Sequence, residues 1–358
     1  MGCSQVGRHS NFYNRCAVRK RYSVHHPYPA FLAEKHALAQ DKEYTFWYDN
    51  NTISSYKCLW DQMNTADFKQ RYTRLISGLG KDSLDCVGKI LSRLRLVASQ
   101  NPVPRGGVEY LDIFSLDEKY QLDKMRREFT EQILQLSDHC WAYNHYLLPI
   151  NSFEPSVFYY QLQIDTLKNP NYFMNRDIID VGGYIGDSAL VLSEYTNNNV
   201  YAFEPTTDYH ELMQKTIELN SKKNIVPVKQ ALGSKNERLT IKIAGLVSRI
   251  VKEPELNVSD GEYEGIEVTT LDDFVKGRDV DIGLIKVDIE GFEQEFLKGS
   301  KNTIKRYRPT LLISIYHNAD DFFSIKPLIE SWDLDYTFRI SRPVLGAVKH
   351  DTLLICEQ

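Results

Sequence analysis

The sequence predicts an α/β fold: a doubly wound, mostly parallel sheet in residues 151–358, preceded by a mainly helical region. Three observations predict it. Short β-rich runs alternate with helical segments after Leu147, and a glycine-rich turn follows the first run. The last two β-rich runs follow one another directly, which is typical of a terminal hairpin with an antiparallel strand. Alternating strands and helices build parallel sheets that are covered by helices on both faces.

The first 150 residues lack this alternation. Residues 1–28 show no periodic pattern, and we expect a loose arm there. Residues 29–150 carry helical patterns, the longest of which covers residues 115–141 and opens with a capping box of Ser115 and Glu118. We therefore expect the arm, a mainly helical domain at 29–150 and the sheet domain at 151–358.

Each element of the sheet domain has its own pattern. Apolar or alternating runs predict strands, and apolar residues three and four positions apart predict helices. The expected strands are 177–182, 199–205, 224–232, 282–289, 308–317, 335–340 and 351–357, and the expected helices are 187–195, 208–220, 292–300 and 320–332. Two further runs, 238–244 and 265–271, predict an antiparallel pair.

The composition is that of a soluble globular protein, with 42% hydrophobic and 25% charged residues. A net charge of −5 argues against nucleic-acid binding through a basic surface. The charge is uneven: 20 basic and 16 acidic residues precede Asn151, whereas 23 basic and 32 acidic residues follow it. The basic excess near residues 15–26 is either a solvated tail or a docking patch for an acidic partner.

The six cysteines form no CxxC pair, so we expect free thiols in a reducing compartment and no metal site. The sequence contains no run of about 18 apolar residues, so we expect no membrane span. The polar start of the chain lacks the apolar core of a secretory signal. Together these features predict a cytoplasmic protein.

A glycine-rich turn at the end of the first strand indicates a ligand seat, because ligands of doubly wound sheets lie beyond the carboxyl ends of the strands. Glycine lets the backbone turn sharply and approach a ligand closely. The residues expected at this seat are Asp180, Gly182, Gly183, Gly186, Asp187 and Ser188.

The ends of the next two strands suit the adenosine part of a ligand. Glu204 ends the second strand, 18 residues after Gly186, where a carboxylate can accept hydrogen bonds from both ribose hydroxyls. Gln230 and Ala231 end the third strand and are expected at the edge of an adenine ring.

Both NAD and S-adenosyl-L-methionine carry adenosine, and two details favour the second. The turn has the spacing GGxxG and not the GxGxxG that binds a pyrophosphate at a helix N-terminus. Asp180 and Asp187 flank the turn, and carboxylates repel a pyrophosphate but attract a sulfonium. We expect S-adenosyl-L-methionine as cofactor, with an NAD-dependent oxidoreductase and a purely structural turn as the alternatives.

Two charged residues stand in a run that otherwise predicts a buried strand. Lys286 and Asp288 are two positions apart and project from one face. Unpaired charges are costly to bury, so these residues form an internal ion pair or serve a reaction site. His317 ends the next strand and is expected to titrate near neutral pH, either as a structural residue or as a base. Glu290 and Glu293 are interpreted as acids that suit a helix N-terminus.

These stretches resemble the FkbM family of S-adenosylmethionine-dependent methyltransferases. The matching pieces are DIIDVGGYIGDSA, VYAFEP, PVKQALG, VTTLDDF, LIKVDIEGFEQEFLKG and RPTLLISIYH, which lie between about residue 153 and the C-terminus. The resemblance implies a class I methyltransferase fold: a Rossmann-like, seven-stranded sheet with a reversed final hairpin. It also implies methylation of hydroxyl oxygens of sugars, glycans or natural products.

The resemblance further implies roles for single residues. The methionine end of the cofactor would be cradled by Asp180, Gly182 and Gly186. Glu204 would hold the ribose, and Asp288 and His317 would face the methyl group and the acceptor. Gly183 stands where the family commonly has alanine.

The helical region has no counterpart in this resemblance, so the acceptor and the oligomeric state stay open. That region is expected to cover the acceptor pocket, to form a homo-oligomer or to dock onto a pathway enzyme. A catalytically silent protein that binds the cofactor and recruits a partner is a further alternative.

Overall fold

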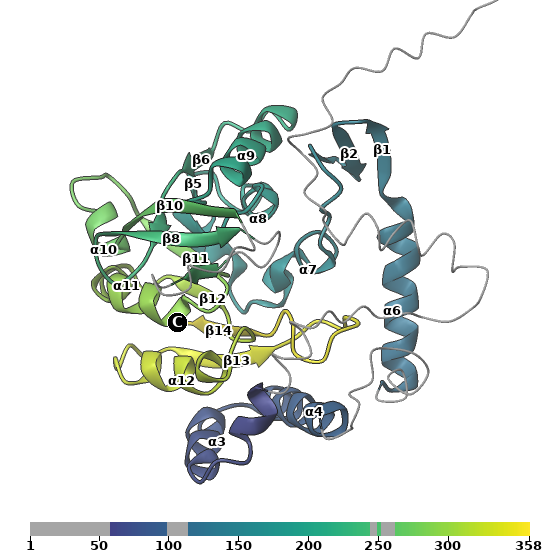
Figure 1. The fold of residues 1–358 in the computed structure, drawn as a ribbon, viewed down its shortest axis with the longest axis vertical. Coiled ribbons are helices and arrows are strands. Elements are labelled where there is room, and N and C mark those ends of the chain that lie inside the picture. Colours follow the sequence, from purple (N-terminus) through teal and green to yellow (C-terminus); the bar gives the residue numbers. More distant parts are fainter. Residues whose placement is uncertain (1–57, 99–113, 244–248, 252–261) are drawn as a thin grey trace, which may run out of the picture.

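The computed structural model describes residues 58–98, 114–243, 249–251 and 262–358 (Figure 1). Among these residues, seven strands form the central sheet in the order β13-β14-β12-β11-β4-β5-β6. The strands are β4 (Asp177–Val181), β5 (Val200–Phe203), β6 (Ile225–Val228), β11 (Ile282–Val287), β12 (Thr310–Ser314), β13 (Thr337–Ser341) and β14 (Leu353–Glu357). β14 pairs antiparallel with both of its neighbours, β12 and β13, and the other pairs of this sheet are parallel. The expected class I methyltransferase topology, including the reversed final hairpin, is confirmed.

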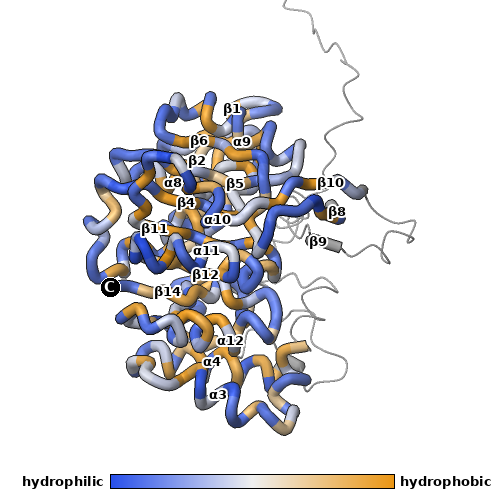
Figure 2. Tube along the Cα trace, turned by 90° about the vertical axis from the view of Figure 1, so that its left-hand side faces the viewer, coloured by the Kyte–Doolittle hydropathy of each residue, from blue (hydrophilic) through white to orange (hydrophobic). Residues whose placement is uncertain are grey.

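Helices cover both faces of this sheet because its central strands are apolar on both sides. Ile178 and Leu284 belong to the core under one face, whereas Ile179 and Ile285 belong to the core under the other. The first face is covered by α7 (Pro155–Phe158), α8 (Asp187–Leu192) and α9 (Thr207–Leu219), and the second by α10 (Leu271–Phe274), α11 (Glu293–Tyr307) and α12 (Ala319–Glu330). Hydrophobic segments accordingly run through the middle of the molecule, with hydrophilic ones mostly outside (Figure 2).

A smaller sheet lies beside the central one. It contains β7 (Ala231–Leu232), β8 (Glu237–Ile243), β9 (Arg249–Val251) and β10 (Glu262–Thr269) in the order β7-β10-β8-β9. The antiparallel pair expected from the sequence is β8 and β10. The third expected strand, 224–232, is divided between the two sheets, because its last residues pair with β10 instead of β5.

The predicted arm at 1–28, with its basic excess, lies outside the described residues, as do 29–57 and 99–113 of the predicted helical domain. The helices described there include α3 (Phe68–Ile76), α4 (Lys81–Ala98) and α6 (Leu116–Glu128). The capping box of Ser115 and Glu118 is present at the start of α6.

The single long helix predicted over residues 115–141 is wrong in its second half. The chain leaves α6 after Glu128 and forms an antiparallel sheet of β1 (Leu134–Ser137), β2 (Cys140–Tyr143) and β3 (Tyr146–Leu148). Buried aromatic residues explain the change, because Tyr143 and Tyr146 pack against Phe129, Phe153 and Phe158 of neighbouring segments. Tertiary packing here outweighs local helix preference.

Helix α4 packs against β13, the edge strand of the central sheet, and α3 packs against α12 (Figure 1). Arg71 of α3 pairs with Asp320 and stacks over Phe323 of α12. Ser83 of α4 accepts a hydrogen bond from the backbone N–H of Ile340 in β13. These helices therefore share one core with the sheet, and the division of the chain near residue 150 stays a proposal.

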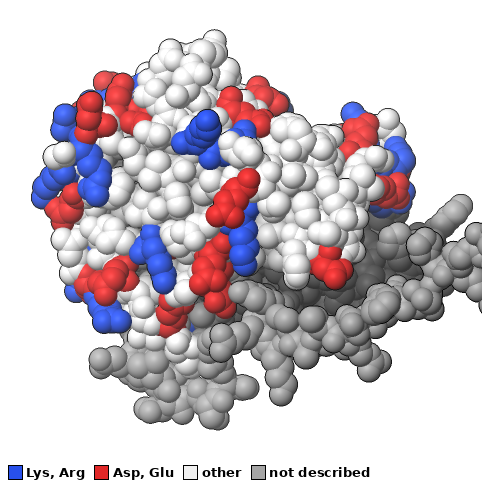
Figure 3. All heavy atoms as spheres, turned by 90° about the horizontal axis from the view of Figure 1, so that it is seen from above, with Lys and Arg blue, Asp and Glu red and all other residues white. Residues whose placement is uncertain are grey.

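On the face of the described residues that Figure 3 shows, acidic and basic side chains are interspersed, and neither sign forms a patch of its own. Within the described ranges, every helix is too short or too polar to cross a membrane. Cys58, Cys86, Cys140 and Cys356 are free thiols.

One buried ion pair joins α4 to α6. The side chains of Arg93 and Glu118 are 7% and 6% exposed, and Glu118 also accepts hydrogen bonds from Lys89 and from the backbone of Ser115. Burial opposes ionisation of Glu118, but the hydrogen bonds from Arg93, Ser115 and Lys89 outweigh it and lower the pKa to about 2.

Replacing Glu118 by glutamine is expected to lower the free energy of unfolding by about 3 kcal/mol at pH 7, because Arg93 keeps a buried charge without its partner. The difference from wild type should shrink as pH falls from about 4.5 towards 2, where Glu118 takes up its proton. Urea unfolding at pH 7, 4 and 3 measures it. Glu131→Gln, in the exposed pair with Arg126, is the control and should change stability by less than about 1 kcal/mol. A pH-independent difference would contradict the account.

Candidate active site

The predicted site residues meet along one edge of the central sheet. His317, Asp288, Gly182, Glu204 and Gln230 follow β12, β11, β4, β5 and β6, which are neighbours in that order. These strands are parallel, so their carboxyl ends lie at the same edge. The structure thus brings together residues that are up to 135 positions apart in the sequence.

The glycine turn between β4 and α8 depends on backbone that other residues do not tolerate. Gly182 and Gly186 have φ angles of 85° and 84°. A Cβ atom at Gly182 would lie 1.9 Å from the carbonyl oxygen of Asp288, so the turn lies directly against the end of β11. At Gly183 a Cβ atom would lie 2.7 Å from the flexible end of Met213 and 3.3 Å from the Cβ of Ala202. The turn therefore requires glycine more strictly at 182, where a Cβ meets backbone, than at 183.

Lys286 lies beneath this turn and not beside His317. Its Nζ atom donates to the carbonyl oxygen of Gly182 at 2.8 Å and lies 3.1 Å from Oδ1 of Asp180. The pairing of β11 with β4 sets this contact, since Lys286 stands opposite Asp180 in the register. Of the two alternatives for Lys286, the contacts match an ion pair, but its partner is Asp180 and not Asp288, and they indicate a positioning role instead of a catalytic one.

Asp187 and Ser188 complete the support of the turn. Ser188 donates through its hydroxyl to Asp180 at 2.7 Å, and its backbone N–H donates to Asp187 at 2.9 Å. Burial raises the pKa of Asp187 to about 6. All three polar side chains, Asp180, Asp187 and Ser188, are buried, so they support the turn from the protein interior.

Glu204 is a buried carboxylate at the end of β5, only 7% exposed. It accepts hydrogen bonds from the backbone N–H and the hydroxyl of Thr206, at 2.9 and 2.6 Å. Burial nevertheless raises its pKa to about 7. A glycine-rich turn beside a buried carboxylate fits an adenosyl cofactor, with the backbone of Gly182–Gly186 on one side and Glu204 on the other.

Gln230 and Ala231 lie beside this carboxylate. The backbone N–H groups of Glu204 and Gln230 both donate to the carbonyl of Val228, at 3.1 and 2.9 Å. Both Gln230 and Ala231 are partly exposed. Their place fits the expected adenine edge.

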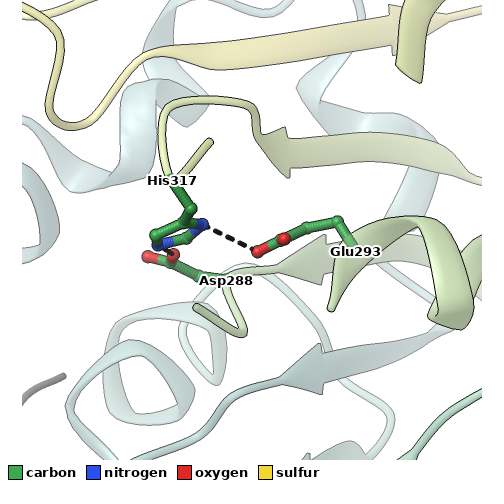
Figure 4. A group of neighbouring side chains, drawn as sticks. All are labelled: Asp288, Glu293 and His317. Atoms are coloured by element: carbon green, nitrogen blue, oxygen red, sulfur yellow. Dashed lines mark ion pairs between the residues drawn. The ribbon is translucent and has the colours of Figure 1, made fainter. Parts of the chain in front are cut away.

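On the other side of the turn, His317 lies between carboxylates (Figure 4). Its Nε2 atom is 3.2 Å from Asp288 Oδ1 and 3.7 Å from Glu290 Oε2, and its Nδ1 atom is 2.9 Å from Glu293 Oε1. Glu293 also accepts the backbone N–H of Ile289 at 2.9 Å and is fully buried. Glu293 therefore does more than suit a helix N-terminus: it holds the imidazole ring.

The carboxylates change the titration expected for His317. Burial lowers its pKa, but Glu293, Glu290 and Asp288 outweigh burial and raise the pKa well above its usual value. The expectation of titration near neutral pH is therefore wrong, and the ring carries a positive charge at neutral pH. Burial likewise opposes ionisation of Asp288, but the hydrogen bond from His317 lowers the pKa of that carboxyl.

Several members of this cluster carry no clear signal in the sequence. Tyr316 donates to Asp288 Oδ1 at 3.3 Å. Burial raises the pKa of Asp321, beside Glu293, to about 7 and lowers the pKa of Lys349 to about 8. Glu290 is the exception: it adopts a left-handed backbone (φ 55°) before Gly291, and burial raises its pKa to about 7. The position of Glu290 directly before Gly291 is the one local feature of the sequence that indicates this left-handed turn.

Comparison with known proteins indicates the family to which the residues at this edge of the sheet belong. The family profile described as "Methyltransferase FkbM domain" matches residues 180–340. This part of the chain belongs to the FkbM methyltransferase family. The matched FkbM domain contains every predicted site residue, from Asp180 to His317. The cofactor of the family, S-adenosyl-L-methionine, is the one expected from the sequence.

Two relatives illustrate the similarity. Hexuronic acid methyltransferase AglP of Haloferax volcanii is 29% identical over 142 residues, which are 39% of this chain and 56% of the relative. The crystal structure of methyltransferase FkbM from Methylobacillus flagellatus KT shares the fold with a TM-score of 0.50 and 17% identity, over 84% of this chain and 62% of that one. The chain described here thus spans 56% of the length of the first protein and 62% of the second.

The glycine turn provides a matched pair of variants. Gly182→Ala is expected to lower the melting temperature by several degrees and to weaken binding of S-adenosyl-L-methionine, because the new Cβ meets backbone and φ is positive. Gly183→Ala should stay close to wild type in both respects. Thermal unfolding and calorimetry measure the two effects. Equal behaviour of the two variants would contradict the geometry.

Proposed function

We propose that the chain is an S-adenosyl-L-methionine-dependent O-methyltransferase whose acceptor is a hydroxyl of a sugar or a related natural product. One observation carries the proposal: the glycine turn lies directly against Asp288, between the Asp288–His317 pair on one side and Glu204 on the other, at one edge of a methyltransferase fold. The name of the Haloferax volcanii relative, which methylates a hexuronic acid, supports a sugar as the acceptor class.

The residues of the edge divide into those that hold the cofactor and those that face the acceptor. The backbone of Gly182–Gly186 receives the methionine part, Glu204 the ribose, and Gln230 with Ala231 the adenine. Asp180, Asp187, Ser188 and Lys286 keep the turn in place through the contacts described above. Bound there, S-adenosyl-L-methionine supplies a methyl group on a cationic sulfur.

Asp288 is the group that faces the acceptor. Its side chain is 33% exposed, whereas that of His317 is 7% exposed and lies behind it. Because the ring is charged, we assign the proton-accepting oxygen to Asp288, and His317 holds that carboxylate in place together with Tyr316. Orientation is the larger contribution, since a well-aligned pair of reactants is worth about 7–11 kcal/mol.

The acceptor class is tested by supplying radiolabelled S-adenosyl-L-methionine with extracts of the cells that make the protein and with a panel of neutral and acidic sugars. We expect label in a sugar-containing product that resists mild alkali, as an ether does. Binding of the cofactor without any transfer would favour the silent binding protein. A melting temperature raised by NAD and not by S-adenosyl-L-methionine would favour the oxidoreductase.

His317→Ala is expected to lower turnover about 100-fold, the scale of a lost acid–base contribution, because Asp288 loses the partner that positions it. The affinity for S-adenosyl-L-methionine should stay within about twofold. Turnover is measured with the acceptor found by labelling, and affinity by calorimetry. An equal loss of turnover and of cofactor affinity would show that Asp288 and His317 do not act on the acceptor.

Glu204→Ala is expected to weaken cofactor binding at least tenfold, because the ribose loses its buried hydrogen-bond acceptor. The pKa of Glu204 is about 7, so the ionised form prevails above pH 7 and the affinity of the wild type should fall as pH drops below it. Glu204→Gln should remove most of this pH dependence. Calorimetry between pH 6 and 8.5 measures both effects, and unchanged affinity in Glu204→Ala would remove this residue from the site.

A further inference from the structure

Negative charge exceeds positive charge around His317. The carboxylates of Asp288, Glu290 and Glu293 all lie within 3.7 Å of its ring nitrogens. The second oxygen of Glu293 is buried and meets no hydrogen-bond donor among the described residues, and its neighbour Asp321 is another acid. His317 and the nearby Lys349 are a small counterpart for this set, so part of it either takes up protons, as the raised pKa values of Glu290 and Asp321 indicate, or binds a further cation.

The distances suit a metal ion on the Nε2 side of the ring. Two ligand atoms at about 2.1 Å from a six-coordinate ion, at right angles to one another, are about 3.0 Å apart. Asp288 Oδ1 and Glu290 Oε2 lie 3.2 and 3.7 Å from Nε2, so each carboxylate oxygen is a small side-chain movement away from this spacing to the ring nitrogen. The carboxylates of Asp288 and Glu290 are 33% and 32% exposed, which leaves further coordination positions open.

The Nδ1 side of the ring already has the support that a metal-binding histidine needs. Metal-bound imidazoles commonly donate their other N–H to a carboxylate, which fixes the orientation of the ring. Glu293 occupies that position at 2.9 Å, is fully buried and is itself fixed by the backbone N–H of Ile289. The group Asp288, Glu293 and His317 brings its ligand atoms within 4.8 Å of one another (Figure 4).

We propose that Asp288, Glu290 and Nε2 of His317 bind one divalent cation of the Mn²⁺ or Mg²⁺ class, and that Glu293 orients the imidazole for it. The ion takes the place of the proton on Nε2. Two oxygen ligands and open positions suit these hard cations, and the imidazole favours Mn²⁺ of the two. The sequence predicts no metal, because the ligands come from two strand ends and a turn that only the fold brings together.

The site adjoins the cofactor seat, because the carbonyl of Asp288 lies against Gly182. Its role rests on the proposed function. A hydroxyl bound to a divalent ion is a stronger acid than a free one, which compensates for the weak basicity of Asp288. In the transfer, the acceptor oxygen bonds to the methyl carbon, the carbon–sulfur bond breaks to leave S-adenosylhomocysteine, and the hydroxyl proton passes through Asp288 to water.

Binding of Mn²⁺ to the full chain is measured by electron paramagnetic resonance at pH 8, without cofactor or acceptor. We expect one ion per chain with a Kd below about 100 μM. Asp288→Asn and Glu290→Gln should each weaken binding at least tenfold, and Glu293→Gln about 10- to 100-fold. Glu295→Gln is the matched control, because Glu295 lies on the same helix as Glu293 but pairs with Lys298. Thermal unfolding verifies that each variant is folded.

Three results would overturn the cation site: no binding by the wild type at 1 mM Mn²⁺, unchanged binding in both Asp288→Asn and Glu290→Gln, or an equal loss in Glu295→Gln. These results are separate from the test of the proposed function. Cofactor binding and label transfer that persist in EDTA would refute the role of the ion in the transfer and leave the proposed function standing. Mn²⁺ binding by a chain that does not bind S-adenosyl-L-methionine would refute the methyltransferase proposal and leave the cation site standing.

Discussion

The buried ammonium group of Lys286 is the interaction on which the rest of this edge depends. It joins Asp180 of β4 to the carbonyl of Gly182 and so fixes the glycine turn against the end of β11. Removal of one partner of such a buried pair costs about 3–5 kcal/mol, because the other charge stays behind. The same contact sets the distance between the cofactor seat and Asp288, since Gly182 lies directly against that residue's carbonyl.

The two halves of the edge use charge in different ways. Around the turn, Asp180 is neutralised from below by Lys286, so the surface offered to a ligand is backbone and one buried carboxylate, Glu204. Around His317, the carboxylates outnumber the cation that they surround. The first half suits a ligand held by its hydroxyl groups, and the second suits a positive charge close to the reacting oxygen.

The sequence predicts the sheet and the cofactor side well because their signals are local: an apolar strand, a glycine turn, and a carboxylate one helix and one strand later. It predicts the acceptor side poorly because its contacts cross between elements. Lys286 and Asp288 do project from one face, but the register of β11 with β4 gives Lys286 its own partner. Glu293 matches an ordinary helix N-terminus equally well, and only the position of His317 shows its use. Residues 134–148 contain three strands because Tyr143 and Tyr146 have aromatic neighbours outside this segment that no periodicity reveals.

The central claim is that the glycine turn and Glu204 form the seat of an adenosyl cofactor. A crystal structure of the protein grown with S-adenosylhomocysteine tests it most directly. The account predicts the ribose hydroxyls at Glu204, the amino-acid part along Gly182–Gly186 and the sulfur turned towards Asp288. A seat that stays empty under saturating ligand, or that is filled by side chains of the protein itself, would contradict it.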